Sequence, residues 1–393
     1  MHGLTRRHLL RLFALLASGR ALRPWDVRSP ENSRAQGVSD LARGGSPATA
    51  AIAGERPRVV QVHAPGVTDW DFGASSYLDH IDQAVVSRMV DEGLARLTGA
   101  ASRAEAWQAL LPEFSAGQRI AIKVNFNNYI DGSEGDAINA VIEPVNALVA
   151  GLLERGFAPA DITVYDMTNA WHAGGIPPRF VAGCAFPGVR FEGYLDSDQP
   201  YSEAERVHFS PPAWADPVDD LPLARPVVEA DYLINLPIVK SHSFAGVTLG
   251  FKNHFGSIEH CDRLHVYTPG FEPNAFDPQY SPVVDLNRNP HIRAKTALIL
   301  GDCLFGGWMD PISKPQPWAS FGNRAPASLF FGRDPLATEC VMADLLAAET
   351  ALLPETDGYL RLAAAAGLGV YERADPWQNT YRQIDFVRVE LDS

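Results

Sequence analysis

Two short segments of the chain place lysine beside asparagine or histidine at alternate positions. The first contains Lys123 and Asn125, at the end of an apolar run that begins at Ile120. Because side chains alternate along a strand, these two polar residues share one face, and their apolar neighbours point to the other. A lysine ammonium and an asparagine amide on one face favour an anion. A lysine that reaches off the sheet into an ion pair explains the same pattern without a ligand.

The second segment runs from Asp231 to His242 and is also apolar at its centre. Pro237 interrupts it, and a proline lacks the backbone N–H that a central strand needs. We expect the strand to end there and the chain to expose Lys240 and His242, two residues apart. Ligands of open α/β sheets bind beyond the carboxyl ends of the strands, so both segments point to one edge of the sheet.

A cation, an amide and an imidazole follow one another at Lys252, Asn253 and His254. Gly246 and Gly250 precede them, and glycine permits a ligand to approach the backbone closely. Lysine, amide and backbone N–H groups together favour a carboxylate or a phosphate. The alternative without a site is a loop of lysine and histidine held by carboxylates elsewhere in this acidic chain.

The chemistry of these side chains suggests their roles. Histidine titrates near neutral pH, and a lysine removed from water can serve as a base or a nucleophile. The predicted catalytic residues are His242, Lys252 and Lys240. The predicted substrate-binding residues are Lys123, Asn125, Asn253, His254, Gly246 and Gly250.

A later loop contains three candidate metal ligands, His260, Cys261 and His265. Their spacing matches none of the closed zinc patterns, so a solvated loop with one buried cysteine is the simpler interpretation. The four cysteines of the chain are widely spaced, without a C-x-x-C pair. This spacing favours neither a disulfide scaffold nor a ferredoxin-type iron–sulfur cluster. The cofactor is therefore left open, with a metal ion as one candidate.

The elements that must position these residues alternate between strands and helices. Several strands are continuous apolar runs, which is typical of strands buried on both faces of a parallel sheet. The predicted strands are 59–63, 120–126, 162–166, 232–236, 297–301, 329–332 and 386–391, and the predicted helices are 77–97, 103–110, 137–155, 335–349 and 356–366. The alternation predicts an α/β fold with a mostly parallel sheet flanked by helices. We expect one domain over residues 57–393, in one or two lobes, with the site at the carboxyl ends of the strands.

The composition of the chain limits its partners. Lys and Arg number 33 against 47 Asp and Glu, a net charge of −14, which argues against nucleic acid or an anionic membrane surface. The lysines are few, and they are Lys123, Lys240, Lys252, Lys295 and Lys314. A lysine retained in an arginine-rich chain indicates a place that needs a compact ammonium with a tunable pKa. Three of these lysines fall in the motifs described above, whereas Lys295 and Lys314 fall in none and are expected at the surface.

The first residues resemble a targeting signal. Arg6 and Arg7 lie in a segment similar to the twin-arginine export signature, and the apolar run that follows, 12–17, is far shorter than the roughly 20 residues that span a bilayer. We expect a signal over residues 1–22, a disordered leader over 23–56, and export to the periplasm by the twin-arginine machinery. A basic amphipathic helix is the alternative. No other segment predicts a transmembrane helix.

The motifs at 122–125, 231–242, 246–256 and 332–335 resemble, in the same order, those of the bacterial and archaeal family called domain of unknown function 362. The lysine-x-histidine and lysine-asparagine pairs are the most specific part of this resemblance. It extends over roughly residues 57–372. Many members of the family carry ferredoxin-like clusters, for which this chain has no matching cysteines, so the resemblance does not imply electron transfer here.

The pattern H-x-x-A-G-x-x-x-G-x-K, from His242 to Lys252, is similar to a motif of the nickel-pincer lactate racemases. This resemblance implies that His242 transfers protons and that Lys252 carries a covalently attached cofactor. His260 and His265 lie closer to the lysine than the nickel-ligating histidine of that family does. The resemblance therefore implies the scaffold and the location of the site, and not the nickel pincer.

The leading hypothesis is an exported α/β enzyme that acts on a small anionic substrate. The chemistry would be acid–base catalysis by lysine and histidine, of the kind that isomerases and racemases perform. The alternative is a periplasmic anion-binding, metal-binding or redox protein without turnover. Ligand affinity that survives His242→Ala, without conversion of the bound compound, would favour the alternative.

Overall fold

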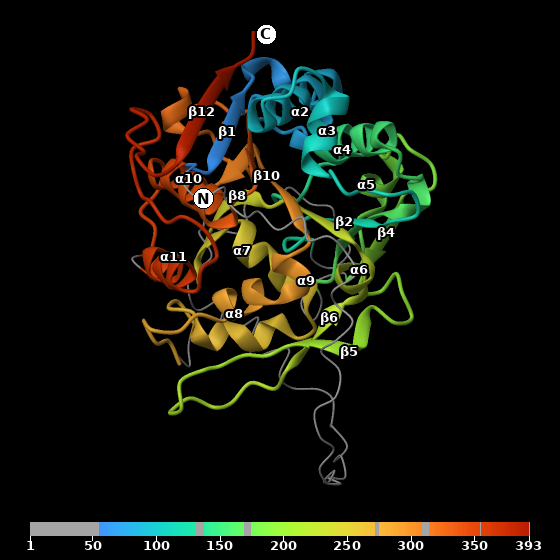
Figure 1. Ribbon diagram of the computed structural model, residues 1–393. Helices are drawn as coiled ribbons and strands as arrows, with labels where there is room; N and C mark the ends of the chain where they lie inside the picture. The colour runs from blue at the N-terminus through green and yellow to red at the C-terminus, as the bar shows by residue number, and fades with distance from the viewer. Residues whose placement is uncertain are drawn as a thin grey trace. The chain divides into compact units, whose positions relative to one another are not determined.

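The computed structural model describes residues 55–129, 137–168, 174–271, 275–308, 314–353 and 355–392 (Figure 1). The predicted signal and all but the end of the predicted leader lie outside these ranges. The described residues belong to one compact unit. None of its helices is both long enough and apolar enough to cross a membrane.

The centre of this unit is a 10-stranded sheet whose main path runs β12-β1-β11-β10-β7-β2-β3-β4. Strand β8 pairs with β10 and with β9 beside this path. The strands of this sheet are β1 (Arg58–His63), β2 (Ile120–Lys123), β3 (Ile162–Asp166), β4 (Arg190–Gly193), β7 (Tyr232–Asn235), β8 (Ile238–His242), β9 (Gly246–Thr248), β10 (Thr296–Gly307), β11 (Ser328–Gly332) and β12 (Asp385–Glu390). A separate antiparallel pair is formed by β5 (Tyr201–Val207) and β6 (Leu221–Ala224).

Most neighbouring strands of the sheet are parallel. The pairs β10–β7, β7–β2, β2–β3 and β3–β4 are all parallel, as are β10–β8 and β1–β12. Strand β11 runs antiparallel to both β1 and β10, and β8 and β9 form an antiparallel hairpin. The predicted α/β class with a mostly parallel sheet is therefore confirmed.

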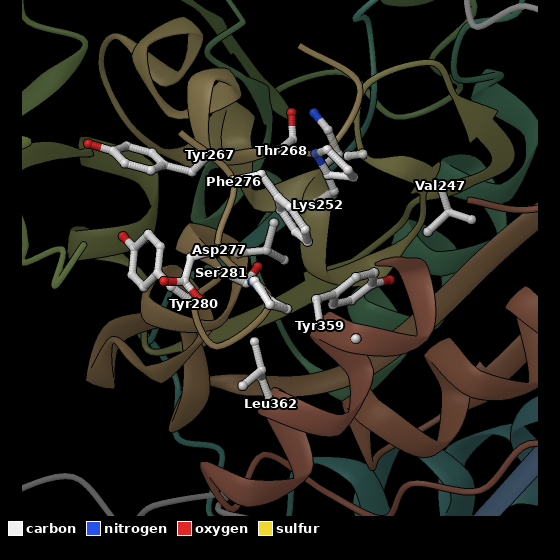
Figure 2. Close-up of a pocket in the computed structure, with 15 residues that line it drawn as sticks. Val247, Lys252, Tyr267, Thr268, Phe276, Asp277, Tyr280, Ser281, Tyr359 and Leu362 are labelled. Atoms are coloured by element: carbon white, nitrogen blue, oxygen red, sulfur yellow. The ribbon is translucent and has the colours of Figure 1, made fainter. Parts of the chain in front are cut away.

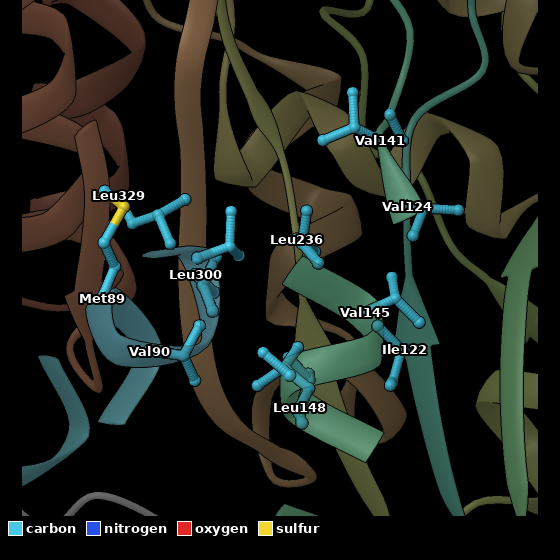
Figure 3. Close-up of a cluster of buried hydrophobic side chains, with 14 of the residues drawn as sticks. Met89, Val90, Ile122, Val124, Val141, Val145, Leu148, Leu236, Leu300 and Leu329 are labelled. Carbon is cyan, nitrogen blue, oxygen red and sulfur yellow. The ribbon is translucent and has the colours of Figure 1, made fainter. Parts of the chain in front are cut away.

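Helices cover both faces of the sheet. They are α2 (Gln83–Thr98), α3 (Arg103–Leu110), α4 (Ile142–Arg155), α5 (Pro178–Ala182), α6 (Arg225–Glu229), α7 (Gly250–Asn253), α8 (Pro282–Arg288), α9 (Pro290–Arg293), α10 (Pro335–Ala347) and α11 (Glu355–Ala365). Short 3-10 helices are η1 (Pro65–Val67), η2 (Tyr77–Asp79), η3 (Pro159–Asp161), η4 (His254–Ser257), η5 (Cys261–Tyr267) and η6 (Ala319–Phe321). Helices α2 and α4 bury Met89 and Leu148 against Ile122 and Leu300 on one face (Figure 3). Helix α10 packs on the other face, in a second apolar cluster.

The helix boundaries follow their capping residues. The predicted helix 77–97 is divided, because the Asp82 side chain accepts the N–H groups of Ala84 and Val85 and so begins α2 after η2. Gly99 ends α2 in the left-handed conformation, with φ of 73°. The predicted helices 103–110, 335–349 and 356–366 correspond to α3, α10 and α11.

The interpretation of Pro237 needs a correction. Strand β7 does end before Pro237, but the chain continues as a further strand, β8, which also pairs with β10. Strand β10 is long enough to pair first with β7 and then with β8, and its Asp302 N–H donates to the Pro237 carbonyl at 2.7 Å. Lys240 and His242 are consequently not exposed, since they are 0% and 7% accessible.

Candidate functional site

The carboxyl ends of neighbouring parallel strands bring the predicted residues together. Lys123 ends β2, and its register neighbours are Tyr165 on β3 and Asn235 on β7. Asp166 ends β3, one residue beyond Tyr165. Parallel pairing therefore sets a cation, a carboxylate and an amide side by side at one edge of the sheet.

Lys123 makes a fully buried ion pair. Its Nζ lies 3.1 Å from Asp166 Oδ1 and also donates to the Val124 carbonyl and to Asn253 Oδ1, at 2.5 and 3.3 Å. Burial lowers the pKa of the Lys123 ammonium, and the attraction of Asp166 opposes that effect. Lys123 does not snorkel off the sheet, because both partners of the pair are 1% accessible.

The Asp166 carboxylate is held on several sides by hydrogen bonds. It accepts the Phe126 N–H at 2.6 Å, the Thr168 N–H at 3.1 Å and the Thr168 hydroxyl at 2.7 Å. The backbone of Gly256 covers the pair so closely that a Cβ atom there would lie 2.0 Å from Asp166 Oδ1 and 2.7 Å from Lys123 Nζ. A side chain at this position would collide with the ion pair, so the backbone of Gly256 packs directly on it.

Three asparagines extend this network across the strand ends. Asn253 Oδ1 accepts from Asn125 Nδ2 at 3.1 Å, and Asn253 Nδ2 donates to Asn235 Oδ1 at 2.8 Å. Asn235 Nδ2 in turn donates to the Gly250 carbonyl at 2.8 Å. The amides predicted to bind substrate thus bind one another and the backbone. They fasten the short helix α7, which carries Lys252, to β2 and β7.

His254 lies on the inner side of this network. Its Nδ1 is 3.1 Å from Ser257 Oγ, which lies 2.9 Å from the Tyr165 hydroxyl. Burial, with the nearby Lys123 charge, lowers the pKa of His254 to about 3. His254 is therefore a neutral, structural histidine in a buried hydrogen-bonded chain, and the prediction that it binds substrate is not supported by this geometry.

His242 has a defined tautomer. Its Nδ1 accepts the N–H groups of Phe244 and Ala245, at 3.0 and 3.2 Å, which places the ring proton on Nε2. Burial and the Lys252 charge lower the pKa of His242 well below its usual value. The ring stacks on His265 with centroids 5.7 Å apart. A neutral imidazole held in this way donates one hydrogen bond from Nε2.

Lys252 lies on the same side of the cluster. Its Nζ is 3.2 Å from His265 Nε2 and 4.1 Å from the centre of the Phe255 ring. Burial lowers the pKa of Lys252 to about 8, while the neighbouring Cys261 acts in the opposite direction. The amine is therefore partly deprotonated at mildly alkaline pH.

Lys240 is the exception among the buried lysines. It lies in β8, opposite Thr248 of β9 and beside Gly307 of β10. Within the described part of the chain, neither Lys240 Nζ nor Thr248 Oγ1 has a hydrogen-bond partner. Directly opposite residues of an antiparallel pair share a face, so two unsatisfied polar groups lie together. Burial and the Lys252 charge lower the pKa of Lys240 to about 7.

Glu339 on α10 contributes to the site, although the sequence analysis did not single it out. It is 0% accessible, its carboxylate accepts the Phe251 N–H at 3.2 and 3.3 Å, and the Tyr359 hydroxyl donates to it at 2.7 Å. Burial raises its pKa to about 7. Glu339 thus holds the start of α7 and links it to α11. An acidic residue within the apolar segment 336–346 was the available signal.

The structure shows what surrounds the two predicted glycines. A Cβ atom at Gly246 would lie 2.0 Å from Thr356 Oγ1, and one at Gly250 would lie 3.0 Å from Glu339 Oε2. Both glycines therefore lie against side chains of the protein, and their contact with a ligand stays a prediction. Gly246 also has a φ of 82°, which favours glycine at the turn of the β8–β9 hairpin.

The predicted metal ligands are not brought together as a set. His260 Nε2 faces Glu259 at 3.6 Å and its side chain is 44% exposed, whereas His265 faces Lys252. Burial raises the pKa of the Cys261 thiol to about 12, which disfavours the thiolate that binds metals. In the parts of the chain that the structure describes, no three His, Cys, Asp or Glu side chains are grouped to hold a metal ion. The described surroundings of Lys252 therefore do not fit a nickel-pincer cofactor.

A pocket of about 280 Å³ adjoins Lys252 (Figure 2). Its walls come from the β8–β9 hairpin, the loop after η5, the start of α8 and helix α11. The lining residues are Ala245, Val247, Lys252, Tyr267, Thr268, Pro269, Phe276, Asp277, Pro278, Tyr280, Ser281, Val283, Gly358, Tyr359 and Leu362. Lys252 therefore connects the buried cluster to a cavity that a small molecule can enter.

Comparisons with known proteins give both a family and distant structural neighbours. The lactate racemase apoprotein from Thermoanaerobacterium thermosaccharolyticum is similar at 12% identity and a TM-score of 0.40, over 76% of this chain and 59% of that chain. A crystal structure of a protein from Thermotoga maritima is similar at 11% identity and a TM-score of 0.34, over 56% of this chain and 50% of that chain. The chain thus spans less than two thirds of either structure.

A comparison with curated proteins gave no match. The family model for the Domain of unknown function (DUF362) matches residues 120–344, which is more than half of the chain. The matched region begins at β2 and contains the lysine and asparagine cluster described above. This protein therefore belongs to the DUF362 family.

Proposed function

We propose that this protein is an enzyme that acts on a small anionic substrate by acid–base chemistry, as isomerases and racemases do. The observation that carries the proposal is the Lys240 amine, which is buried beside other basic groups and has no hydrogen-bond partner among the described residues. A buried polar group without a partner is costly, and functional sites are where such groups are retained.

The charges of the cluster explain why the ligand should be an anion. Lys123, Lys240 and Lys252 are all buried, yet among the described residues the one ion pair of these lysines is that of Lys123 with Asp166. The remaining two lysines repel each other, and the mutual effect contributes to the lowered pKa of Lys240. A bound carboxylate would supply the missing negative charge and restore the balance.

The same arrangement assigns a role to each group. Because its pKa lies near 7, Lys240 exists partly as the free amine and is able to accept a proton from a substrate. Lys252, which lines the adjoining pocket, provides the positive charge that binds the anion. His242 cannot accept a proton on Nδ1, which already accepts two N–H groups, so it donates a hydrogen bond from Nε2 to a substrate oxygen.

Exchange of substrate protons with solvent tests this function. The protein is incubated in D₂O with a panel of 2-hydroxy and 2-oxo carboxylates, and NMR follows loss of the C–H signal at C2 of the hydroxy acids and at C3 of the oxo acids. Lys240→Met should abolish exchange, whereas Lys314→Met, at an exposed lysine, should retain it. Equal exchange in both variants would refute the role of Lys240. Tight binding without exchange of any compound would favour the alternative, a binding protein without turnover.

We further propose export through the twin-arginine-type signal, on the basis of the sequence alone. The test is fusion of residues 1–54 to a reporter that is active only after export in a folded state. Replacement of Arg6 and Arg7 by lysine should abolish the exported signal. Unchanged export of that variant would contradict the proposal.

A further inference from the structure

The pocket beside Lys252 has one charged pole and a largely apolar wall. Val247, Val283, Phe276 and Leu362 contribute aliphatic and aromatic surface to it. In Figure 2 Lys252 lies in the upper part of the view and Leu362 in the lower part, and the ring of Tyr359 lies at an intermediate height to their right. A ligand with its anionic group at Lys252 would therefore place the rest of its body against apolar side chains.

The charges that line the pocket are few. Among the described lining residues, Lys252 is the one cation and Asp277 the one carboxylate. Asp277 Oδ1 accepts the Gln279 N–H at 2.7 Å, which fixes this acid on the loop before α8. A ligand that carried a second negative group away from Lys252 would meet this carboxylate, and like charges repel.

The volume of the pocket sets a further limit. Ligand pockets in proteins usually enclose roughly 300–1,000 Å³, and this one, at about 280 Å³, lies just below that range. It has room for a single ring or a short branched chain. It does not have room for a nucleotide or an oligosaccharide.

We infer that this pocket selects monocarboxylates with an apolar body, such as a phenyl or branched alkyl group, and binds their carboxylate at Lys252. The inference rests on the proposed function, because it uses the same cation cluster and adds the class of substrate. It assigns the apolar wall to recognition of the substrate body and Asp277 to exclusion of dicarboxylates.

Calorimetric titration of the full chain with four probes tests the inference: 3-phenylpropionate, propionate, succinate and inorganic phosphate. We expect 3-phenylpropionate to bind about 10- to 100-fold more tightly than propionate, because the phenyl group leaves water for an apolar wall. Succinate should bind more weakly than propionate. Lys252→Met should remove binding of all four probes.

Two substitutions at the far wall separate recognition from folding. Leu362→Trp reduces the space for the phenyl group and should remove the preference for 3-phenylpropionate. Leu362→Met conserves the volume and should keep it. Equal affinity of the wild-type protein for propionate and 3-phenylpropionate, with binding still dependent on Lys252, would overturn the inference and leave the proposed function standing. Failure of every probe to bind in a Lys252-dependent manner would overturn both.

Discussion

Lys123 on β2 and Lys240 on β8 are buried lysines of the same sheet, yet their ammonium groups have opposite surroundings. Lys123 Nζ has a carboxylate, a carbonyl and an amide oxygen within 3.3 Å. Lys240 Nζ has no partner among the described residues, and its nearest cross-strand neighbour, Thr248, also has an unsatisfied hydroxyl. The hydrogen bonds of Lys123 are therefore supplied by the protein, whereas those of Lys240 are not supplied by any described residue.

The difference distinguishes a lysine with a structural role from one for which we propose a functional role. A buried ion pair with its hydrogen bonds complete stabilises a unique arrangement of strand ends and is sensitive to loss of either partner. A buried amine without a partner lowers stability and is retained where chemistry needs it. Residue type and position at a strand end are the same in both cases, so only the contacts tell them apart.

The largest expected effect comes from breaking the satisfied pair. Asp166→Asn leaves the Lys123 charge buried without its counter-ion, and we expect a loss of about 3–5 kcal/mol in the free energy of unfolding. Urea unfolding measures it. Asp385→Asn, which removes a surface ion pair with Arg58, is the control and should cost at most about 1 kcal/mol. If Lys123→Met combined with Asp166→Asn were no more stable than Asp166→Asn alone, the ion pair would not be the cause.

The unpaired lysine should show itself in the pH dependence of stability. Its pKa is about 7 in the folded protein and about 10.4 when unfolded. Between these values the unfolded chain binds more protons, so stability rises with pH, by an amount on the order of a few kcal/mol in total. Lys240→Met should lack this part of the rise and be more stable than wild type at pH 7. Lys314→Met should follow the wild-type curve. A Lys240→Met curve parallel to wild type would contradict the lowered pKa.

A smaller effect is expected from the glycine that covers the Lys123–Asp166 pair. Gly256→Ala places a methyl group within 2.0 Å of Asp166 Oδ1, so the backbone or the pair must move. We expect a loss of about 1–3 kcal/mol, typical of overpacking. Gly358→Ala is the matched control, because nothing lies within 4 Å of a Cβ there and alanine favours the helix. Equal stability of the two variants would show that Gly256 does not pack closely against the Lys123–Asp166 pair.

The smallest effect concerns Glu339, which holds the start of α7. Tyr359→Phe removes the hydroxyl that donates to its carboxylate at 2.7 Å, and we expect a loss of about 1 kcal/mol. It should also weaken binding of 3-phenylpropionate, since Glu339 holds the helix that carries Lys252. Tyr371→Phe, which removes a hydroxyl that donates to Asp357, is the control and should leave that affinity unchanged. Unchanged affinity in Tyr359→Phe would show that this hydroxyl does not help to position Lys252.

Much of the fold followed from apolar runs. Strands β1, β3 and β7 were predicted within a residue of their ends, because buried parallel strands are continuous apolar segments bounded by polar residues. Strands β4 and β5 were not predicted, since their residues are half-buried or exposed and carry charges. Strand β8 was missed because Pro237 was interpreted as the end of pairing, whereas the long β10 supplies a second partner.

The candidate site was predicted in composition but not in the roles of its members. The motifs placed Lys123, Asn253 and Lys252 in one cluster, and the structure does bring them together. Asn235 and Glu339, which complete the polar network, come from segments whose pattern is that of ordinary core elements. Lys295, expected at the surface, is half-buried and donates to two carbonyls at the end of α6. These roles depend on hydrogen-bond partners that are distant in sequence. The spacing of residues along the chain does not predict such partners.

Strand β10 is hydrogen-bonded to β7 along its first half and to β8 along its second. One strand therefore fixes the positions of both Asn235 and Lys240, since each residue pairs with a residue of β10. Strands β7 and β8 cannot shift relative to each other without breaking their hydrogen bonds to β10. If a ligand binds here, the charged side chains already have fixed positions. Little of the binding free energy would then be lost in reorganising the protein.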